Sequence, residues 1–157
     1  IDAGKQRARL EQLLGQLSSG DIRRGQAVFH GTKAACSSCH AMGYLGGRVG
    51  PDLTRIGGIR VERDLLEAVV YPSASFVRSY EPVVVVTAQG KTYNGLVKKD
   101  SIDEIVLAIN ATEEVRLSRD EIDEIRPSIV SVMPSGLDQQ LTPQELADLI
   151  AFLKSAK

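Results

Sequence analysis

Two cysteines and a histidine fall within five consecutive residues, Cys36-Ser-Ser-Cys39-His40, and this pentad constrains the fold more than any other feature. The chain of 157 residues has only two cysteines and two histidines, so it holds no disulfide framework. Two thiols one helical turn apart can each form a thioether bond with a haem vinyl group, and the adjacent imidazole then lies beneath the iron. The pentad therefore predicts one covalently attached haem c, with His40 as an axial ligand.

The pentad has three other interpretations: a redox dithiol, a zinc site and a chance occurrence. A thioredoxin-like CxxC sits at a strand-to-helix junction of a βαβ unit, whereas glycine and a helix-like sequence precede Cys36. A zinc site needs four ligands, and beyond the pentad only His30 offers a further imidazole. Short motifs also arise by chance. These alternatives stay open here, and covalent haem attachment is favoured.

Length and charge exclude several classes of function. With a net charge of −1, the chain offers no basic field for nucleic acid. No apolar run approaches the roughly 18 residues that span a membrane. The length suits one core, or one domain with a smaller one set into it. The sequence begins at Ile1 without Met, which we interpret as a mature product or an excised domain.

Hydrophobic periodicity and capping residues predict four helices, at 5–17, roughly 21–30, 62–71 and from Thr142 onward. Asp21 is the expected N-cap of the second helix, and Pro72 ends the third. The last helix opens on a capping box between Thr142 and Glu145, with proline at its first position. Six glycines within residues 43–58 suggest a loop that wraps closely round a flat ring, because no phosphate-loop pattern is present.

The stretch between the pentad and the last helix has a different pattern. Residues 80–126 contain four or five short segments with period-two alternation or β-branched runs, separated by turn residues. Several short strands joined by tight turns favour a small antiparallel barrel. We therefore predict an α+β fold that is mostly helical, with a β-barrel-like module inserted at 80–126.

The sequences that flank the pentad resemble those of class I c-type cytochromes. The matching segments are GDIRRGQAVF before it, GGRVGPDLTRIG after it and LTPQELADLIAFLKS at the C-terminus. The resemblance implies a cytochrome c haem domain over 19–79 and 127–157, interrupted by the β-module at 80–126, with 1–18 as an N-terminal helix or linker tail. It also implies that the first and last core helices cross at Gly25, Phe29 and Phe152.

The resemblance further implies both axial contacts. In the family's G-P-x-L segment a proline carbonyl orients the proximal imidazole, which matches Pro51, and such a partner fixes the tautomer of the histidine; a simple turn proline is the alternative. The distal ligand is commonly a methionine followed by proline shortly before the last helix, which matches Met133. Met42 lies two residues from His40 and cannot cross the ring, so we expect it to pack. His30 is the rival ligand and is expected to face solvent, whereas a Met133 that does not bind iron would plug the haem edge.

Further side chains are expected round the haem. An apolar shell should exclude water from the iron and raise its reduction potential; it comprises Val49, Leu53, Ile56, Leu66, Val70 and residues 129–132. Arg48 and Arg55 are candidates to neutralise haem propionates, with solvated loop charge as the alternative. Tyr44 is a candidate for a propionate hydrogen bond, or for cover of the haem edge.

The β insertion makes the chain similar to a haem-binding domain type described in planctomycetes and verrucomicrobia, over about residues 20–155. The segments YPSA (71–74) and IRPSIVSVMPSGL (125–137) carry this resemblance. It implies electron transfer by one haem c bound through Cys36 and Cys39, with His40 and Met133 on the iron and no enzyme activity of the chain's own. A haem enzyme or gas-sensing domain with an open or labile distal site is the alternative, and an interaction module that depends on its β-part is a third.

Compartment and partners follow from the same resemblance. Cysteines that carry haem need attachment on the oxidising side of a membrane, so a periplasmic or other extracytoplasmic location is expected. The family often forms part of larger secreted redox proteins. The expected partner is therefore a redox protein or a fused dehydrogenase domain, with no nucleic acid partner and no membrane span in this chain.

Overall fold

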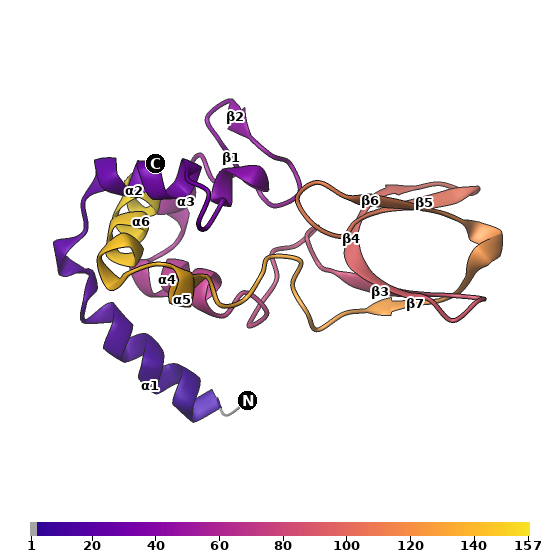
Figure 1. Cartoon of the computed structure of the whole chain (residues 1–157), viewed down its shortest axis with the longest axis horizontal. Helices are drawn as coiled ribbons and strands as arrows, with labels where there is room; N and C mark the ends of the chain where they lie inside the picture. Colours follow the sequence, from indigo (N-terminus) through magenta and orange to yellow (C-terminus); the bar gives the residue numbers. More distant parts are fainter. Residues whose placement is uncertain (1–2) are drawn as a thin grey trace.

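The computed structural model describes residues 3–157 and combines a helical part with an antiparallel sheet, as Figure 1 shows. The helices are α1 (Ala3–Leu14), α2 (Ile22–His30), α3 (Ile56–Ile59), α4 (Glu62–Val70), α5 (Leu137–Gln140) and α6 (Pro143–Ser155). Short 3₁₀ turns occur at Leu17–Ser19, Cys36–Ser38 and Arg119–Glu121. The strands are β1 (Ala41–Met42), β2 (Leu45–Gly46), β3 (Val83–Thr87), β4 (Thr92–Asp100), β5 (Glu104–Ala108), β6 (Glu114–Ser118) and β7 (Ile122–Pro127). The predicted mixture of helix and strand is confirmed.

Capping residues set the beginnings of α2 and α6. The Asp21 carboxylate accepts a hydrogen bond from the Arg24 backbone N–H at 2.8 Å, and so satisfies one of the donors that a helix start leaves free. At α6 the Thr142 hydroxyl and the Glu145 side chain bond each other's backbone N–H, and Pro143 is the first helical residue. Both predicted caps are confirmed.

The predicted helix over 5–17 is wrong at its end. Helix α1 stops at Leu14, because Gly15 follows and glycine is a poor helix former. The chain then makes a turn, and Leu17 is buried from there rather than from the helix. Helix α4 ends at Val70, two residues before Pro72 and one residue short of the predicted end at 71.

Helix α2 packs directly on α6. A Cβ added to Gly25 would overlap the carbonyl oxygen of Asp148 and approach the Phe152 Cβ to 2.7 Å, so the two backbones lie closer than any larger residue allows. The Phe29 and Phe152 rings meet with centroids 5.5 Å apart. The structure therefore brings together the glycine and the two aromatic residues that were expected at this contact.

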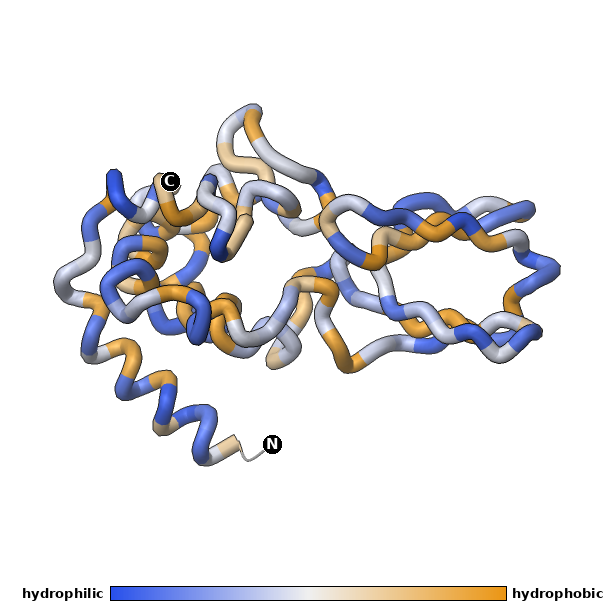
Figure 2. Tube along the Cα trace, in the orientation of Figure 1, coloured by the Kyte–Doolittle hydropathy of each residue, from blue (hydrophilic) through white to orange (hydrophobic). Residues whose placement is uncertain are grey.

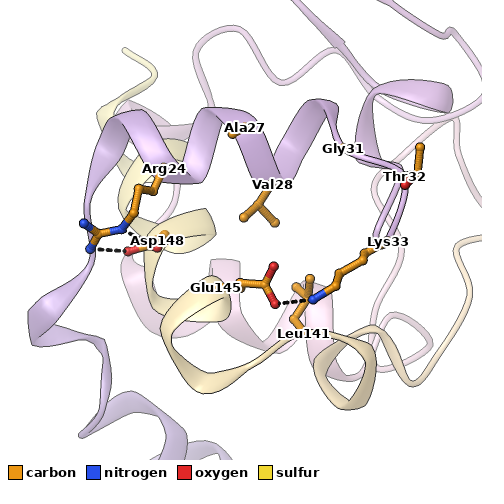
Figure 3. A pocket seen from close by; sticks show the side chains of 9 residues that line it. All are labelled: Arg24, Ala27, Val28, Gly31, Thr32, Lys33, Leu141, Glu145 and Asp148. Carbon is orange, nitrogen blue, oxygen red and sulfur yellow. Dashed lines mark hydrogen bonds and ion pairs between the residues drawn. The ribbon is translucent and has the colours of Figure 1, made fainter.

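Asp148 ties the same two helices together through charge. Its side chain is buried, and it accepts hydrogen bonds from Arg24 Nε at 2.9 Å (Figure 3), from the Asp21 N–H at 2.8 Å and from Gln144 Nε2 at 2.8 Å. Burial alone would raise the pKa of Asp148, but these three donors together hold it below its ordinary value of 3.8. Because the native pKa lies below the unfolded one, the stabilisation is complete above about pH 4 and is lost as the pH falls further.

Replacing Asp148 with asparagine is expected to lower the free energy of unfolding at pH 7 by about 1.5 kcal/mol, the scale of a hydrogen bond to a charged group. The difference from wild type should shrink as the pH falls below about 4, because Asp148 then becomes protonated first in the unfolded state and, at lower pH, in the native state as well. Urea unfolding at pH 7 and pH 3 measures both values. Glu124→Gln, at an exposed ion pair with Arg126, is the control. A deficit of equal size at both pH values would contradict the expectation.

Strands β3 to β7 form one antiparallel sheet in the order β6-β5-β4-β3-β7, and β1 pairs separately with β2. Strand β4 is its longest member and belongs to both halves, because Thr92–Gly95 pair with β3 whereas Leu96–Asp100 pair with β5. The sheet therefore curls, and Figure 1 shows β3 and β7 facing β5 and β6.

The predicted barrel is wrong. The edge strands β6 and β7 are not paired with each other in the part of the chain that the structure describes. The curled sheet encloses a small core of Val85, Ile105, Leu107 and Leu117, and apolar residues gather along both halves of the sheet (Figure 2). These side chains hold the two halves apart, and the turn at Arg119–Glu121 crosses from one half to the other. The result is an open curled sheet.

Buried residues form a second, larger cluster among the helices, which includes Leu10 of α1. Helix α1 therefore packs on the helical part; residues 1 and 2 of the predicted segment 1–18 lie outside the described residues. The division into 1–18, 19–79 with 127–157, and 80–126 stays a prediction. Among residues 3–157, no helix has both the length and the apolar character needed to cross a membrane.

Candidate cofactor site

A mostly apolar cavity of about 360 Å³ lies beside the pentad. Its walls come from segments far apart in sequence: Cys36, Cys39 and His40 of the pentad, Val49 to Leu53 of the following loop, Leu65 and Val69 of α4, Leu96 of β4, residues 131–133, and Leu149 and Leu153 of α6. Both helices and sheet therefore contribute to one site.

The pentad itself forms a compact turn. Ala35 adopts the left-handed conformation with φ of 52°, which turns the chain sharply after α2. Residues Cys36–Ser38 then make a 3₁₀ turn in which the Cys36 carbonyl accepts hydrogen bonds from the N–H groups of Cys39 at 3.2 Å and His40 at 3.0 Å. The turn brings both free thiols and the imidazole to the cavity wall.

The chemistry of Cys36 bears on the redox-dithiol interpretation. Burial raises the pKa of the Cys36 thiol to about 11, from an ordinary value of 9.0. Disulfide exchange needs a thiolate, which redox CxxC sites obtain by lowering the pKa. At neutral pH Cys36 is a neutral thiol, so the site disfavours the redox-dithiol interpretation.

His40 is held in one orientation. Its Nδ1 lies 2.8 Å from the carbonyl oxygen of Pro51, and because a carbonyl can only accept, Nδ1 carries the proton and Nε2 keeps its lone pair. Burial lowers the pKa of His40, against the opposing effect of the Pro51 hydrogen bond. The imidazole is therefore neutral at neutral pH, which is the form that binds metals. Pro51 has the position relative to His40 that the family resemblance implied.

Gly50 lets the following loop lie against the imidazole ring. A Cβ at this position would come within 2.5 Å of His40 Cε1. The Gly50 N–H also donates to the Cys39 carbonyl at 2.8 Å, and the Leu53 N–H to the Ala41 carbonyl at 2.9 Å. This loop and the pentad are thus one hydrogen-bonded unit.

Met133 lines the same cavity as His40 and is half-buried. Its backbone N–H donates to the Ser131 hydroxyl at 3.1 Å, and the Ser131 N–H donates to the Ser73 hydroxyl at 2.9 Å. Met42 packs against the helical core and does not line the cavity, and His30 is exposed. Each has the position that was expected from sequence.

Other predicted site residues fall into two groups. Val49, Leu53, Ile56 and Val132 line the cavity. Residues that do not line it are Tyr44, Arg48, Arg55, Leu66, Val70, Ile129 and Val130. The Tyr44 side chain is fully exposed at the tip of the β1–β2 hairpin, Ile129 is 85% exposed, and neither covers the cavity.

Sequence reasoning missed several lining residues. On α4 the cavity contacts Leu65 and Val69 rather than the predicted Leu66 and Val70, which are buried elsewhere in the helical core. All four belong to one wide apolar stripe, so their spacing could not distinguish them. Leu96 of the sheet carries no local signal for this role.

A second hollow, of about 320 Å³, lies between α2 and α6 (Figure 3). Its charged residues are paired with each other, Arg24 with Asp148 and Lys33 with Glu145. We therefore assign no ligand to it.

The donor groups at the cavity fit a porphyrin-held iron better than a bare ion. Within residues 3–157, no three His, Cys, Asp or Glu side chains form a group that could hold a metal ion. An iron already bound by four porphyrin nitrogens needs only two ligands from the protein. His40 Nε2 and the Met133 thioether are available on the walls of one apolar cavity, beside two thiols suited to thioether bonds.

No protein-family model matches the chain, and no curated protein matches it in sequence. Function is therefore inferred from the site.

Proposed function

We propose that the chain binds one haem c covalently and carries single electrons. One observation carries the proposal: two free thiols, an imidazole held through Nδ1 and a methionine converge on one apolar cavity. Imidazole and thioether are the axial pair of electron-carrying cytochromes c. When bound, the haem supplies a reversible one-electron change at its iron.

Each residue of the site has a separate role in this proposal. Cys36 and Cys39 hold the group through thioether bonds. Pro51 fixes the tautomer and orientation of His40 and raises its basicity as a ligand. Leu53 and the other apolar side chains exclude water, and the low dielectric disfavours the extra charge of the oxidised state, which raises the reduction potential.

The choice between an electron carrier and a haem enzyme or gas sensor depends on whether Met133 binds the iron. A carrier keeps both axial ligands in both oxidation states, whereas an enzyme or sensor needs an open distal position. The presence of Met133 at the cavity, anchored through Ser131 and Ser73, supports the carrier. Carbon monoxide binding to the ferrous protein would instead favour the enzyme or sensor.

We further propose a class I cytochrome c fold with an inserted sheet, of the planctomycete and verrucomicrobial domain type. The α2–α6 contact at Gly25 and the His40–Pro51 hydrogen bond support this assignment. Because haem attachment to thiols requires an extracytoplasmic compartment, the proposed location is the periplasm or its equivalent. The proposed partner is a redox protein or a fused dehydrogenase domain.

Expression in a host with periplasmic cytochrome c maturation tests the proposal. The purified chain is expected to weigh one haem more than its 17.0 kDa polypeptide and to keep its colour through denaturing electrophoresis, because thioether bonds survive unfolding. The double variant Cys36→Ser/Cys39→Ser, made in the same host, should be colourless under denaturing conditions. Colourless wild-type protein with the mass of the bare polypeptide would refute the proposal.

A further inference from the structure

Strand β4 contacts the loop that holds His40 through Pro51 and the segment that carries Met133. The Lys98 ammonium donates hydrogen bonds to the carbonyl oxygens of Arg48 at 2.9 Å and Val49 at 3.1 Å, immediately before Gly50. Nearer the start of the strand, Asn94 Nδ2 donates to the Val130 carbonyl at 3.0 Å, three residues before Met133.

Leu96 lies between these two residues in the strand, is buried and lines the cavity. Residues at period two share one face of a strand, so Asn94 and Leu96 point to the same side. Lys98 falls at a bulge: Val97 pairs with Leu107 and Lys99 with Val106, so Lys98 has no partner on β5. A bulge re-aims the side chain it carries, and that of Lys98 reaches the loop before Pro51.

Two further contacts hold these groups in place. The Lys98 ammonium lies 5.4 Å from the centroid of the Tyr80 ring, within the range of a cation–π interaction, and Tyr80 also lines the cavity. The Asn94 side-chain carbonyl accepts a hydrogen bond from the Ser128 hydroxyl. The Ser128 N–H in turn donates to the Pro82 carbonyl at 3.0 Å, so the segment that leads to Met133 leaves the sheet from a fixed point.

We propose that β4 is a positioning strand, in which Lys98 and Asn94 fix the spacing between the Pro51 loop and the Met133 segment. The inserted sheet thereby sets how well His40 and Met133 fit one iron between them. The inference rests on the proposed function, because it assigns Lys98 and Asn94 a role toward the haem ligands. Neither residue touches the haem itself in this proposal; both act through backbone carbonyls.

Each variant changes the contacts of a single side chain. Lys98→Met removes the ammonium and keeps an unbranched apolar stem, and Lys98→Arg restores donors. Asn94→Leu removes the amide at similar volume. Lys99→Met is the matched control, because Lys99 is the neighbouring exposed lysine and pairs with Glu104 on the sheet at 3.0 Å. All are prepared as haem-loaded full chains.

The first measurement is displacement of the Met133 thioether by added imidazole in the ferric protein, followed by the weak far-red absorption band of a thioether–iron bond. Asn94→Leu is expected to raise the apparent imidazole affinity about three- to tenfold, within the range that the loss of its two hydrogen bonds allows. Lys99→Met should leave it unchanged.

The second measurement is amide hydrogen exchange by mass spectrometry. Lys98→Met should speed exchange in residues 47–53, and Asn94→Leu in residues 128–133, whereas Lys98→Arg should restore the wild-type rate. If both variants match Lys99→Met in exchange and in imidazole affinity while haem is bound, the positioning role is refuted and the proposed function stands. A wild-type chain that takes up no haem refutes both.

Discussion

Replacing Gly25 with alanine is expected to lower the free energy of unfolding by about 4 kcal/mol or more, which places it among the most damaging single substitutions. The added Cβ would overlap the Asp148 carbonyl, a backbone atom that cannot rotate away. Helix α6 would have to move off α2 and open the contact between Phe29 and Phe152. Alanine favours a helix over glycine by only about 1 kcal/mol, which is too little to compensate.

Urea unfolding followed by circular dichroism measures this effect. Gly58→Ala is the matched control, because a Cβ at Gly58 meets nothing closer than the Lys157 side chain at 3.9 Å. It should be neutral or slightly stabilising, by up to about 1 kcal/mol. Equal stability of the Gly25→Ala and wild-type chains would contradict the close contact of α2 and α6.

Replacing Met133 with leucine is expected to abolish the thioether–iron band and to lower the reduction potential by about 0.2 V. Leucine keeps the volume and the apolar character, so the packing changes little while the sulfur ligand is lost. The identity of the axial ligands spreads haem potentials over roughly 0.8 V, and a thioether lies toward the positive end. The ferrous variant should also bind carbon monoxide readily, because its distal position is open.

Met42→Leu makes the same chemical change at a methionine that packs against the core outside the cavity. Its spectrum and potential should match those of the wild type. Spectro-electrochemistry on the three proteins gives both values. An unchanged band in Met133→Leu would mean that another group binds the iron, and the proposal of an electron carrier would lose its main support.

The four longer helices could be predicted because their limits depend on nearby residues, whereas the single turns α3 and α5 were not predicted. Asp21 and Thr142 cap α2 and α6 through bonds that span three residues, and such patterns are visible in sequence. The end of α1 was missed because the leucine periodicity continues through Gly15 to Leu17, although the helix does not. The strands of the larger sheet followed from alternation or β-branched runs, whereas closure of the sheet depends on contacts between its two distant edges, which no local pattern contains.

The candidate site was predictable to the extent that it is local. The pentad and Pro51 lie within sixteen residues of each other, and the structure joins them by a hydrogen bond. Met133 was predicted as a ligand from the resemblance, as a methionine followed by proline shortly before the last helix, and because the chain has only two methionines. The contacts of Lys98 and Asn94 join carbonyls 50 and 36 residues away, and an exposed lysine on a strand looks like ordinary surface charge.

The two proposed iron ligands differ in when they become available. Cys36, Cys39 and His40 precede β3 in the chain, so they are synthesised before the sheet. Met133 follows the sheet in the chain, so bringing it to the cavity beside His40 carries the entropic cost of closing a long loop. The folded sheet shortens this loop, because it joins Ser128 to Pro82. The proposed haem can thus be attached early in biogenesis. Met133 then reaches the iron only as fast as the β-sheet folds, and long-range pairing makes this folding slow.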